Sequence, residues 1–191
     1  MKNYKNTLLY TVFFIILMTL AIWGYNYLKE KYTNDEIKQN YGEAEVNDII
    51  ETMEKAKNFK TVNYDGKEVN LSDYFGKPII VNFWETWCSP CKLELPEFNK
   101  VYLKHKDNIE FMMVNLTDGY KGDTQSVKNF INNNGYQFPV YFDVNNSAAN
   151  AYSIFSIPKT IFIDKDGNIA YTFLGILTEE KLEEYINKLI K

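Results

Sequence analysis

The chain has 191 residues, 46% hydrophobic and 24% charged, which is enough for one globular domain plus an anchor or tail. Its net charge is −4, its charges are interspersed, and all its positive side chains are lysines. The absence of a basic stripe argues against a nucleic-acid-binding protein. The absence of arginine disfavours a site that binds phosphate or carboxylate through a bidentate arginine. With only Cys88, Cys91 and His105 as soft ligands, a four-ligand structural zinc site is excluded, and we expect neither a metal site nor a cofactor.

The segment Thr7–Leu28 is uncharged and strongly apolar. As a helix it would be about 33 Å long, which matches the hydrocarbon core of a membrane. Tyr25 and Tyr27 lie at its far end, where interfacial aromatic residues are common. A cleavable signal peptide is the alternative, but the apolar run exceeds the usual length and no small-x-small cleavage site follows it. The segment therefore predicts a retained, single-pass signal-anchor in the cell membrane.

The rest of the chain divides into a polar connection and a globular domain. We expect residues 1–28 to form a cytoplasmic tip and transmembrane anchor, residues 29–60 a juxtamembrane spacer or helix, and residues 61–191 the extracytoplasmic domain. Within the connection, apolar residues from Val46 to Met53 recur with helical spacing, as in a docking helix or a stalk. Lysines on both sides of the anchor support this orientation only weakly.

The globular domain alternates strands and helices, which predicts a mixed α/β sheet covered on both faces. Asp65-Gly66 favours a type I′ turn in the first hairpin, and Pro96 predicts a kink within the first helix. In chain order, the expected strands are Thr61–Tyr64, Lys67–Leu71, Pro78–Trp84, Ile109–Leu116, Phe138–Phe142, Lys159–Ile163 and Asn168–Phe173, and the expected helices are Ser89–Lys104, Thr124–Asn134, Ala148–Tyr152 and Thr178–Ile190.

The segment Trp84–Cys91 (WETWCSPC) contains a C-x-x-C motif between a buried strand and a helix. This places Cys88 at a helix N-terminus, where unpaired N–H groups and the helix dipole stabilise a thiolate. Pro90 suits the first turn, and Cys91 lies one turn deeper, where it can resolve a mixed disulfide. The motif predicts a thiol–disulfide oxidoreductase with Cys88 as nucleophile and Cys91 as resolving cysteine.

The sequence IIVNFWETWCSPCKLELPEF resembles the membrane-anchored, thioredoxin-like thiol–disulfide oxidoreductases of the TlpA/ResA type. The likeness extends from Val62 to the C-terminus and includes VNYDGKEVNLSDYFGKP and SIPKTIFIDKDGNI. It implies a thioredoxin-like fold with an N-terminal β-hairpin, and a TlpA-type insertion of a helix and strand within Asn108–Gly135. It also implies a reductant of protein disulfides, such as those of apocytochrome c during cytochrome c biogenesis, recharged by a membrane electron donor of thiol–disulfide type.

The resemblance further assigns expected roles to individual residues. Pro158 is expected to be cis and to face the disulfide, with the backbone of Ile157 forming a short edge for an extended substrate chain. Asn82 replaces the buried aspartate of classical thioredoxins and cannot take a proton. Glu94, three residues after Cys91, matches an acidic position of the ResA-like subgroup and is expected to accept the proton of that thiol. From spacing alone, Glu94 is equally consistent with a solvated helix residue.

Other residues near the motif carry weaker signals. Trp87 is expected to shield the site and contribute to substrate binding, whereas Trp84 is expected in the core. Glu85 is expected at the surface, where it departs from the small residue common in the family and would change the charge that a partner meets. His105 is expected to be a solvated surface residue.

Two alternative functions use the same fold. A thiol peroxidase expects Pro and Thr before its cysteine, where this chain has Val81 and Glu85. A copper-carrying metallochaperone expects more widely spaced cysteines and a histidine after the motif, but no histidine follows His105. A non-catalytic binding module would leave the complete motif unexplained.

Overall fold

The computed structural model describes Tyr10, Phe14 and residues 17–24, 54–117 and 123–190, in two units, Met1–Thr52 and Met53–Lys191. In the first unit the described residues are helical and their large apolar side chains are exposed. Within these described stretches, no helix has the length and apolarity needed to cross a membrane. The apolar repeat predicted from Val46 to Met53 lies outside the described residues.

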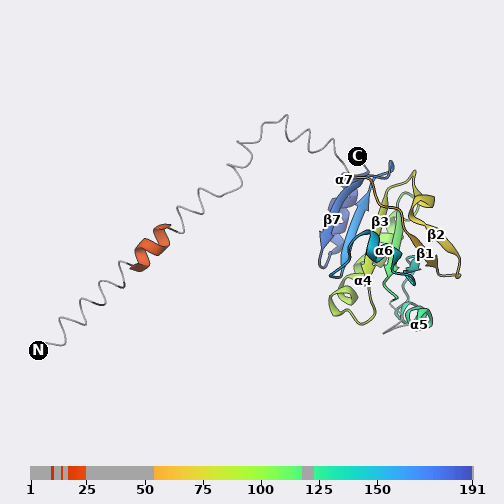
Figure 1. Cartoon of the computed structure of the whole chain (residues 1–191), viewed down its shortest axis with the longest axis horizontal. Helices are drawn as coiled ribbons and strands as arrows, with labels where there is room; N and C mark the ends of the chain where they lie inside the picture. The colour runs from red at the N-terminus through yellow and green to blue at the C-terminus, as the bar shows by residue number, and fades with distance from the viewer. Residues whose placement is uncertain (1–9, 11–13, 15–16, 25–53, 118–122, 191) are drawn as a thin grey trace, which may run out of the picture. The chain divides into compact units, whose positions relative to one another are not determined.

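The second unit is built on a seven-stranded mixed sheet (Figure 1) with the strand order β2-β1-β5-β4-β3-β6-β7. Strands β3, β4 and β5 run parallel, and the other neighbours pair antiparallel. The predicted elements are all present. In chain order they are β1 (Lys60–Asn63), β2 (Glu68–Asn70), η1 (Leu71–Tyr74), β3 (Ile79–Trp84), α4 (Ser89–His105), β4 (Glu110–Asn115), α5 (Thr124–Asn134), β5 (Val140–Phe142), α6 (Ser147–Ala151), β6 (Lys159–Ile163), β7 (Ile169–Leu174) and α7 (Glu179–Leu189).

Strand β3 lies in the middle of the sheet and is buried along its whole length, as its continuous apolar run predicts. Successive side chains of a strand point to opposite faces, so Ile80 and Trp84 enter the core that also contains α4, α5 and α7 residues. Ile79 and Phe83 enter a second core with residues of α6 and η1. Asn82 shares the parity of Ile80, which directs this polar side chain toward α4.

The hairpin between β1 and β2 is present, but its turn is not type I′. Of the two central residues only Gly66 has a positive φ, of 86°, whereas a type I′ turn requires positive φ at both. The carbonyl of Asn63 accepts the Gly66 N–H (3.0 Å), and Asn63 Oδ1 accepts the N–H groups of Asp65 (3.1 Å) and Lys67 (2.9 Å). The Asn63 side chain therefore stabilises a connection with more residues than the two-residue turn that Asp-Gly predicts.

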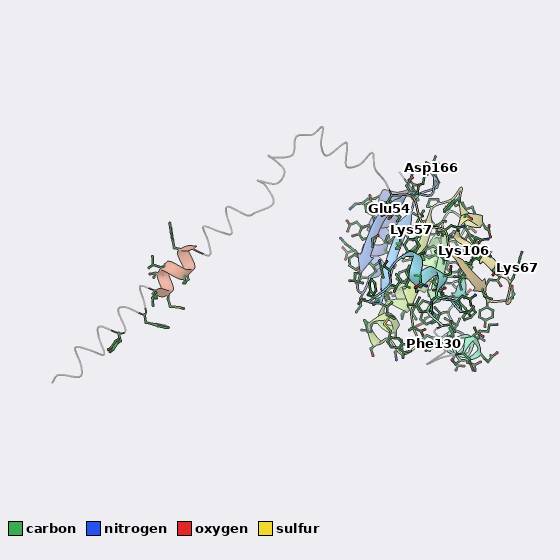
Figure 2. The ribbon with its side chains drawn as sticks, viewed as in Figure 1. Glu54, Lys57, Lys67, Lys106, Phe130 and Asp166 are labelled. Carbon is green, nitrogen blue, oxygen red and sulfur yellow. A yellow bond between two sulfur atoms is a disulfide. The ribbon has the colours of Figure 1, made fainter. Side chains whose placement is uncertain are left out.

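The packed unit includes residues that precede the expected domain start at residue 61. Phe59 is buried, and its carbonyl accepts the N–H of Leu71 (3.1 Å). The carbonyl of Glu54, labelled in Figure 2, accepts the N–H of Ile169 (2.9 Å), so the chain joins β7 before it enters β1. The segment Asn108–Gly135, in which an inserted helix and strand are expected, contains strand β4 and helix α5.

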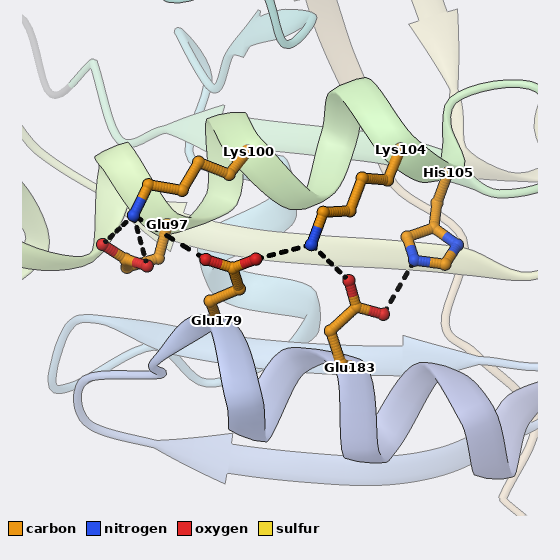
Figure 3. A network of polar contacts seen from close by, with 6 residues as sticks. All are labelled: Glu97, Lys100, Lys104, His105, Glu179 and Glu183. Atoms are coloured by element: carbon orange, nitrogen blue, oxygen red, sulfur yellow. Dashed lines mark hydrogen bonds and ion pairs between the residues drawn. The ribbon is translucent and has the colours of Figure 1, made fainter.

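A row of charged side chains joins α4 to α7 on the surface (Figure 3). Lys104 Nζ contacts carboxylate oxygens of Glu179 (2.5 Å) and Glu183 (3.2 Å), and Lys100 Nζ also reaches Glu179 (3.7 Å). His105 Nε2 lies 2.8 Å from Glu183 Oε2, and its side chain is only 21% exposed. The expectation of a simply solvated His105 is therefore wrong, because α7 packs beside it and provides a partner.

Candidate active site

Cys88 and Cys91 form a disulfide at the start of α4. Strand β3 ends at Trp84, and Cys88 is the N-cap of the helix: its Sγ accepts the N–H of Cys91 (3.2 Å). Pro90 occupies the first turn, where a missing N–H leaves no hydrogen bond unmade. The predicted placement is confirmed. In the reduced state, the same N–H group and the positive end of the helix dipole would stabilise a Cys88 thiolate.

The two cysteines differ in access to solvent. Cys91 is fully buried, whereas Cys88 keeps 4% of its surface and lies directly after Trp87, which is 50% exposed. Cys88 is therefore the only cysteine of the pair that keeps exposed surface. Trp84, by contrast, is fully buried in the core beside the Phe130 ring, 5.9 Å away between ring centroids, as expected.

The loop before β6 faces the disulfide. The Ile157–Pro158 peptide bond is cis, which confirms the expectation, and the Ile157 carbonyl oxygen lies 3.9 Å from Cys88 Sγ. A hollow of about 250 Å³ opens beside it, lined in part by Trp87, Phe155 and Ile157. Phe155 is 94% exposed, and the sequence analysis did not predict its place at the site. Its position three residues before Pro158, as an aromatic residue, could have indicated it.

Glu94 is fully buried, so the alternative of a solvated helix residue is wrong. Its Oε1 accepts a hydrogen bond from Asn82 Nδ2 (2.8 Å), and its Oε2 accepts the N–H of Leu177 (3.0 Å). Burial raises the pKa of the Glu94 carboxyl to about 7, although the hydrogen bonds from Leu177 and Asn82 partly oppose this shift. Glu94 and Cys91 lie at i and i+3 on one buried face of α4.

Glu85 is buried rather than at the surface, with 4% of its area exposed. Its Oε2 accepts the N–H of Thr86 (3.1 Å) and a hydrogen bond from Asn115 Nδ2 (3.3 Å). Glu85 directly follows β3, and the parallel neighbour β4 ends at Asn115. The carboxyl ends of these two strands therefore bring the two polar side chains together, which the sequence does not reveal. Glu85 also lines the hollow beside Trp87.

Within residues 54–117 and 123–190, no three His, Cys, Asp or Glu side chains gather in a way that could hold a metal ion. The candidate site comprises the two sulfur atoms, the buried Glu94 carboxyl and the loop at Pro158. A dithiol–disulfide pair at a helix N-terminus, with the second cysteine buried more deeply than the first, is typical of a thiol–disulfide oxidoreductase.

Comparisons with known proteins agree with this class. The model of the AhpC/TSA family matches residues 52–172. The thiol-disulfide oxidoreductase ResA of Bacillus thuringiensis is 32% identical over 97% of this chain and 98% of its own length, and that of Bacillus subtilis is 36% identical over 69% and 72%. Among solved structures, StoA from Bacillus subtilis has a TM-score of 0.61 at 31% identity, covering 69% of this chain and 97% of StoA.

The chain belongs to the AhpC/TSA family and to the thiol–disulfide oxidoreductases of the ResA type within the thioredoxin-like fold. The resemblance to the TlpA/ResA type and the predicted thioredoxin-like fold are thereby confirmed. Protein dithiols and disulfides are the substrates that this family implies. The individual roles expected for Cys88, Cys91, Glu94, Trp87 and the Ile157–Pro158 loop stay predictions, which the geometry described above supports.

Proposed function

We propose that this protein is a membrane-anchored, extracytoplasmic reductant of protein disulfides. The observation that carries the proposal is the buried Glu94 carboxyl on the same helix face as the resolving Cys91. Near neutral pH this carboxyl exists in both protonation states, because burial has brought its pKa to about 7. A group of this kind can take up and release a proton during each cycle of disulfide exchange.

The reaction begins from the reduced pair. The Cys88 thiolate attacks one sulfur of a substrate disulfide, so that a Cys88–substrate disulfide forms and the first substrate sulfur leaves as a thiolate with the electron pair of the broken bond. Glu94 then takes the proton of the Cys91 thiol. The Cys91 thiolate attacks Cys88 Sγ, the Cys88–Cys91 disulfide forms, and the second substrate sulfur leaves as a thiolate. The substrate gains two electrons and the protein loses two.

The loop at Pro158 provides the proposed substrate contact. The Ile157 carbonyl lies beside Cys88, so an extended substrate chain can place its own N–H groups against this short backbone edge. The hollow next to Trp87 and Phe155 would take an apolar side chain that neighbours the attacked cysteine. Apocytochrome c, with its paired cysteines, is the substrate we propose from the resemblance to TlpA/ResA-type proteins.

The Cys91→Ser variant tests the substrate directly, because it stops the cycle at the mixed disulfide. In cells that make c-type cytochromes, we expect this variant to accumulate a complex with apocytochrome c that reductant releases, and Cys88→Ser/Cys91→Ser to accumulate none. Complexes that consist only of other proteins would contradict the proposed substrate. The membrane electron donor would be captured on Cys88 of the same Cys91→Ser variant, because Cys88 is the cysteine of the pair that keeps exposed surface.

The proposed anchor rests on the uncharged segment Thr7–Leu28 and on the apolar side chains that the described part of this segment exposes. The proposed orientation rests on the resemblance to the membrane-anchored TlpA/ResA-type proteins. The site itself can report the location. After reduction of intact cells, a membrane-impermeant maleimide should label the wild-type protein but not Cys88→Ser/Cys91→Ser. Labelling that requires broken cells would place the domain on the inner side and contradict the proposal.

Neither alternative function gains support from the site. Val81 is fully buried in β3, at the position where a thiol peroxidase expects proline. His105 is separated from Cys91 by 14 residues of one helix, or about 21 Å along its axis, so the two cannot bind the same copper ion. His105 instead pairs with Glu183.

A further inference from the structure

Asn82 occupies an unusual position in the core. It lies in β3, is fully buried, and faces the carboxyl of Glu94 on one side and the hydroxyl of Thr160 in β6 on the other. Its Nδ2 donates one hydrogen bond to Glu94 Oε1 (2.8 Å) and another to Thr160 Oγ1 (3.0 Å). Its Oδ1 is equally buried but has no hydrogen-bond partner among the described residues.

This arrangement suits only one protonation state of Glu94. A carboxylate needs donors, and Asn82 Nδ2 and the Leu177 N–H provide them. A protonated carboxyl instead presents an O–H group that needs an acceptor. If the Asn82 amide turns by 180°, Oδ1 takes the place of Nδ2, where it can accept hydrogen bonds from protonated Glu94 and from the Thr160 hydroxyl. An amide can serve both states, because it carries a donor and an acceptor on one planar group.

We propose that Asn82 is a positioning residue that turns its amide as Glu94 gains and loses the proton of the Cys91 thiol. The inference rests on the proposed role of Glu94 in the resolving step. The proton moves from Cys91 Sγ to Glu94, the amide turns so that Oδ1 accepts the new O–H group, and the Cys91 thiolate attacks Cys88 Sγ. When Glu94 later releases the proton, Nδ2 returns to donate to the carboxylate.

The groups that face Glu94 leave Asn82 as the residue able to make this adjustment. Cys91 of the same helix supplies the proton, and β6 contributes the Thr160 hydroxyl through Asn82. The segment before α7 contributes the Leu177 N–H, a donor that cannot accept. No charged side chain among the described residues is hydrogen-bonded to Glu94. Asn82, which already bonds Glu94 through Nδ2, therefore also carries an acceptor, Oδ1, that has no partner among the described residues.

Ellman's reagent separates the two thiol reactions and provides the test. Reduced full-length protein releases one thionitrobenzoate when Cys88 attacks and a second when Cys91 resolves the mixed disulfide, and stopped-flow absorbance follows both. For the wild type we expect the second phase to accelerate with pH, with an inflection near the pKa of Glu94. In Asn82→Asp two carboxyls share the site, so the inflection should rise by at least one pH unit, which slows the second phase about tenfold at pH 6.

Control variants distinguish this inference from the proposed function. Thr160→Ser keeps the hydroxyl and should keep the wild-type profile. If Glu94→Gln leaves the profile of the second phase unchanged, Glu94 is not the proton acceptor, and both the proposed function and this inference fall. If Glu94→Gln removes the inflection while Asn82→Asp retains the wild-type inflection, only the role of Asn82 is overturned.

A measurement on the unaltered side chain covers the case in which Asn82→Asp does not fold. In ¹⁵N-labelled reduced wild-type protein, the side-chain amide signals of Asn82 should shift with pH and show the same inflection as the second kinetic phase. In Glu94→Gln, which carries no titrating carboxyl, they should not shift. Signals that stay constant with pH in the wild type would show that the amide does not turn and would overturn the inference.

Discussion

Replacing Glu94 by glutamine tests the buried carboxyl through protein stability. The pKa of this group is raised from 4.5 to about 7 in the folded protein, so the native state favours the protonated form. The resulting stabilisation is complete below pH 4.5, the pKa of the unfolded chain, and is lost as the pH rises through 7. A shift of about 2.5 units corresponds to about 3 kcal/mol. Glutamine does not titrate and removes this pH dependence.

The measurement is urea unfolding of the oxidised protein, followed by tryptophan fluorescence at pH 4.5 and pH 8. Between these pH values, the free energy of unfolding of the wild type should fall by about 3 kcal/mol relative to Glu94→Gln. The glutamine can still accept the Leu177 N–H and donate to Asn82 Oδ1, so the variant should fold. Glu97→Gln is the matched control, because Glu97 lies on the same helix and contacts Lys100 at the surface (3.0 Å). A pH-independent difference between wild type and Glu94→Gln would refute the reasoning.

Three further predictions concern other parts of the domain. Cys91→Ser should release only the first thionitrobenzoate from Ellman's reagent; two equivalents would show that Cys91 is not the resolving thiol. Thr178→Ala removes the side-chain cap of α7, which accepts the Lys181 N–H (3.3 Å), and should lower the free energy of unfolding by about 1 kcal/mol, with Thr178→Ser as the control that stays near wild type. Gly135→Ala should cost about 1 kcal/mol in urea unfolding, because Gly135 ends α5 with a φ of 67°, and an unchanged midpoint would contradict this.

The sequence predicts the features that depend on local pattern. The apolar run of β3 requires burial on both faces, and the structure buries all six of its residues. The C-x-x-C motif between this strand and a helix predicts Cys88 as the N-cap. Thr178 and Gly135 mark the beginning of α7 and the end of α5 because caps have strong residue preferences.

Contacts between distant segments could not be predicted in the same way. Leu177 is 83 residues from Glu94 and binds it through a backbone N–H, which no side-chain pattern reveals. Glu85 stands alone after a strand, without a periodicity that could indicate its burial beside Asn115. The type of turn after Asn63 differs from the prediction because hydrogen bonds to the Asn63 side chain outweigh the preference of Asp-Gly for a type I′ turn.

The central claim is that Cys88 and Cys91 form a reducing dithiol–disulfide couple, and its most direct test is the equilibrium reduction potential of the full-length protein. Titration against dithiothreitol or glutathione buffers, read by tryptophan fluorescence, should show one two-electron transition near the thioredoxin end of the scale, at about −270 mV. A transition near the oxidising end, at about −120 mV, would make the protein a disulfide donor and contradict the proposed direction. The absence of any two-electron transition would contradict the oxidoreductase function itself.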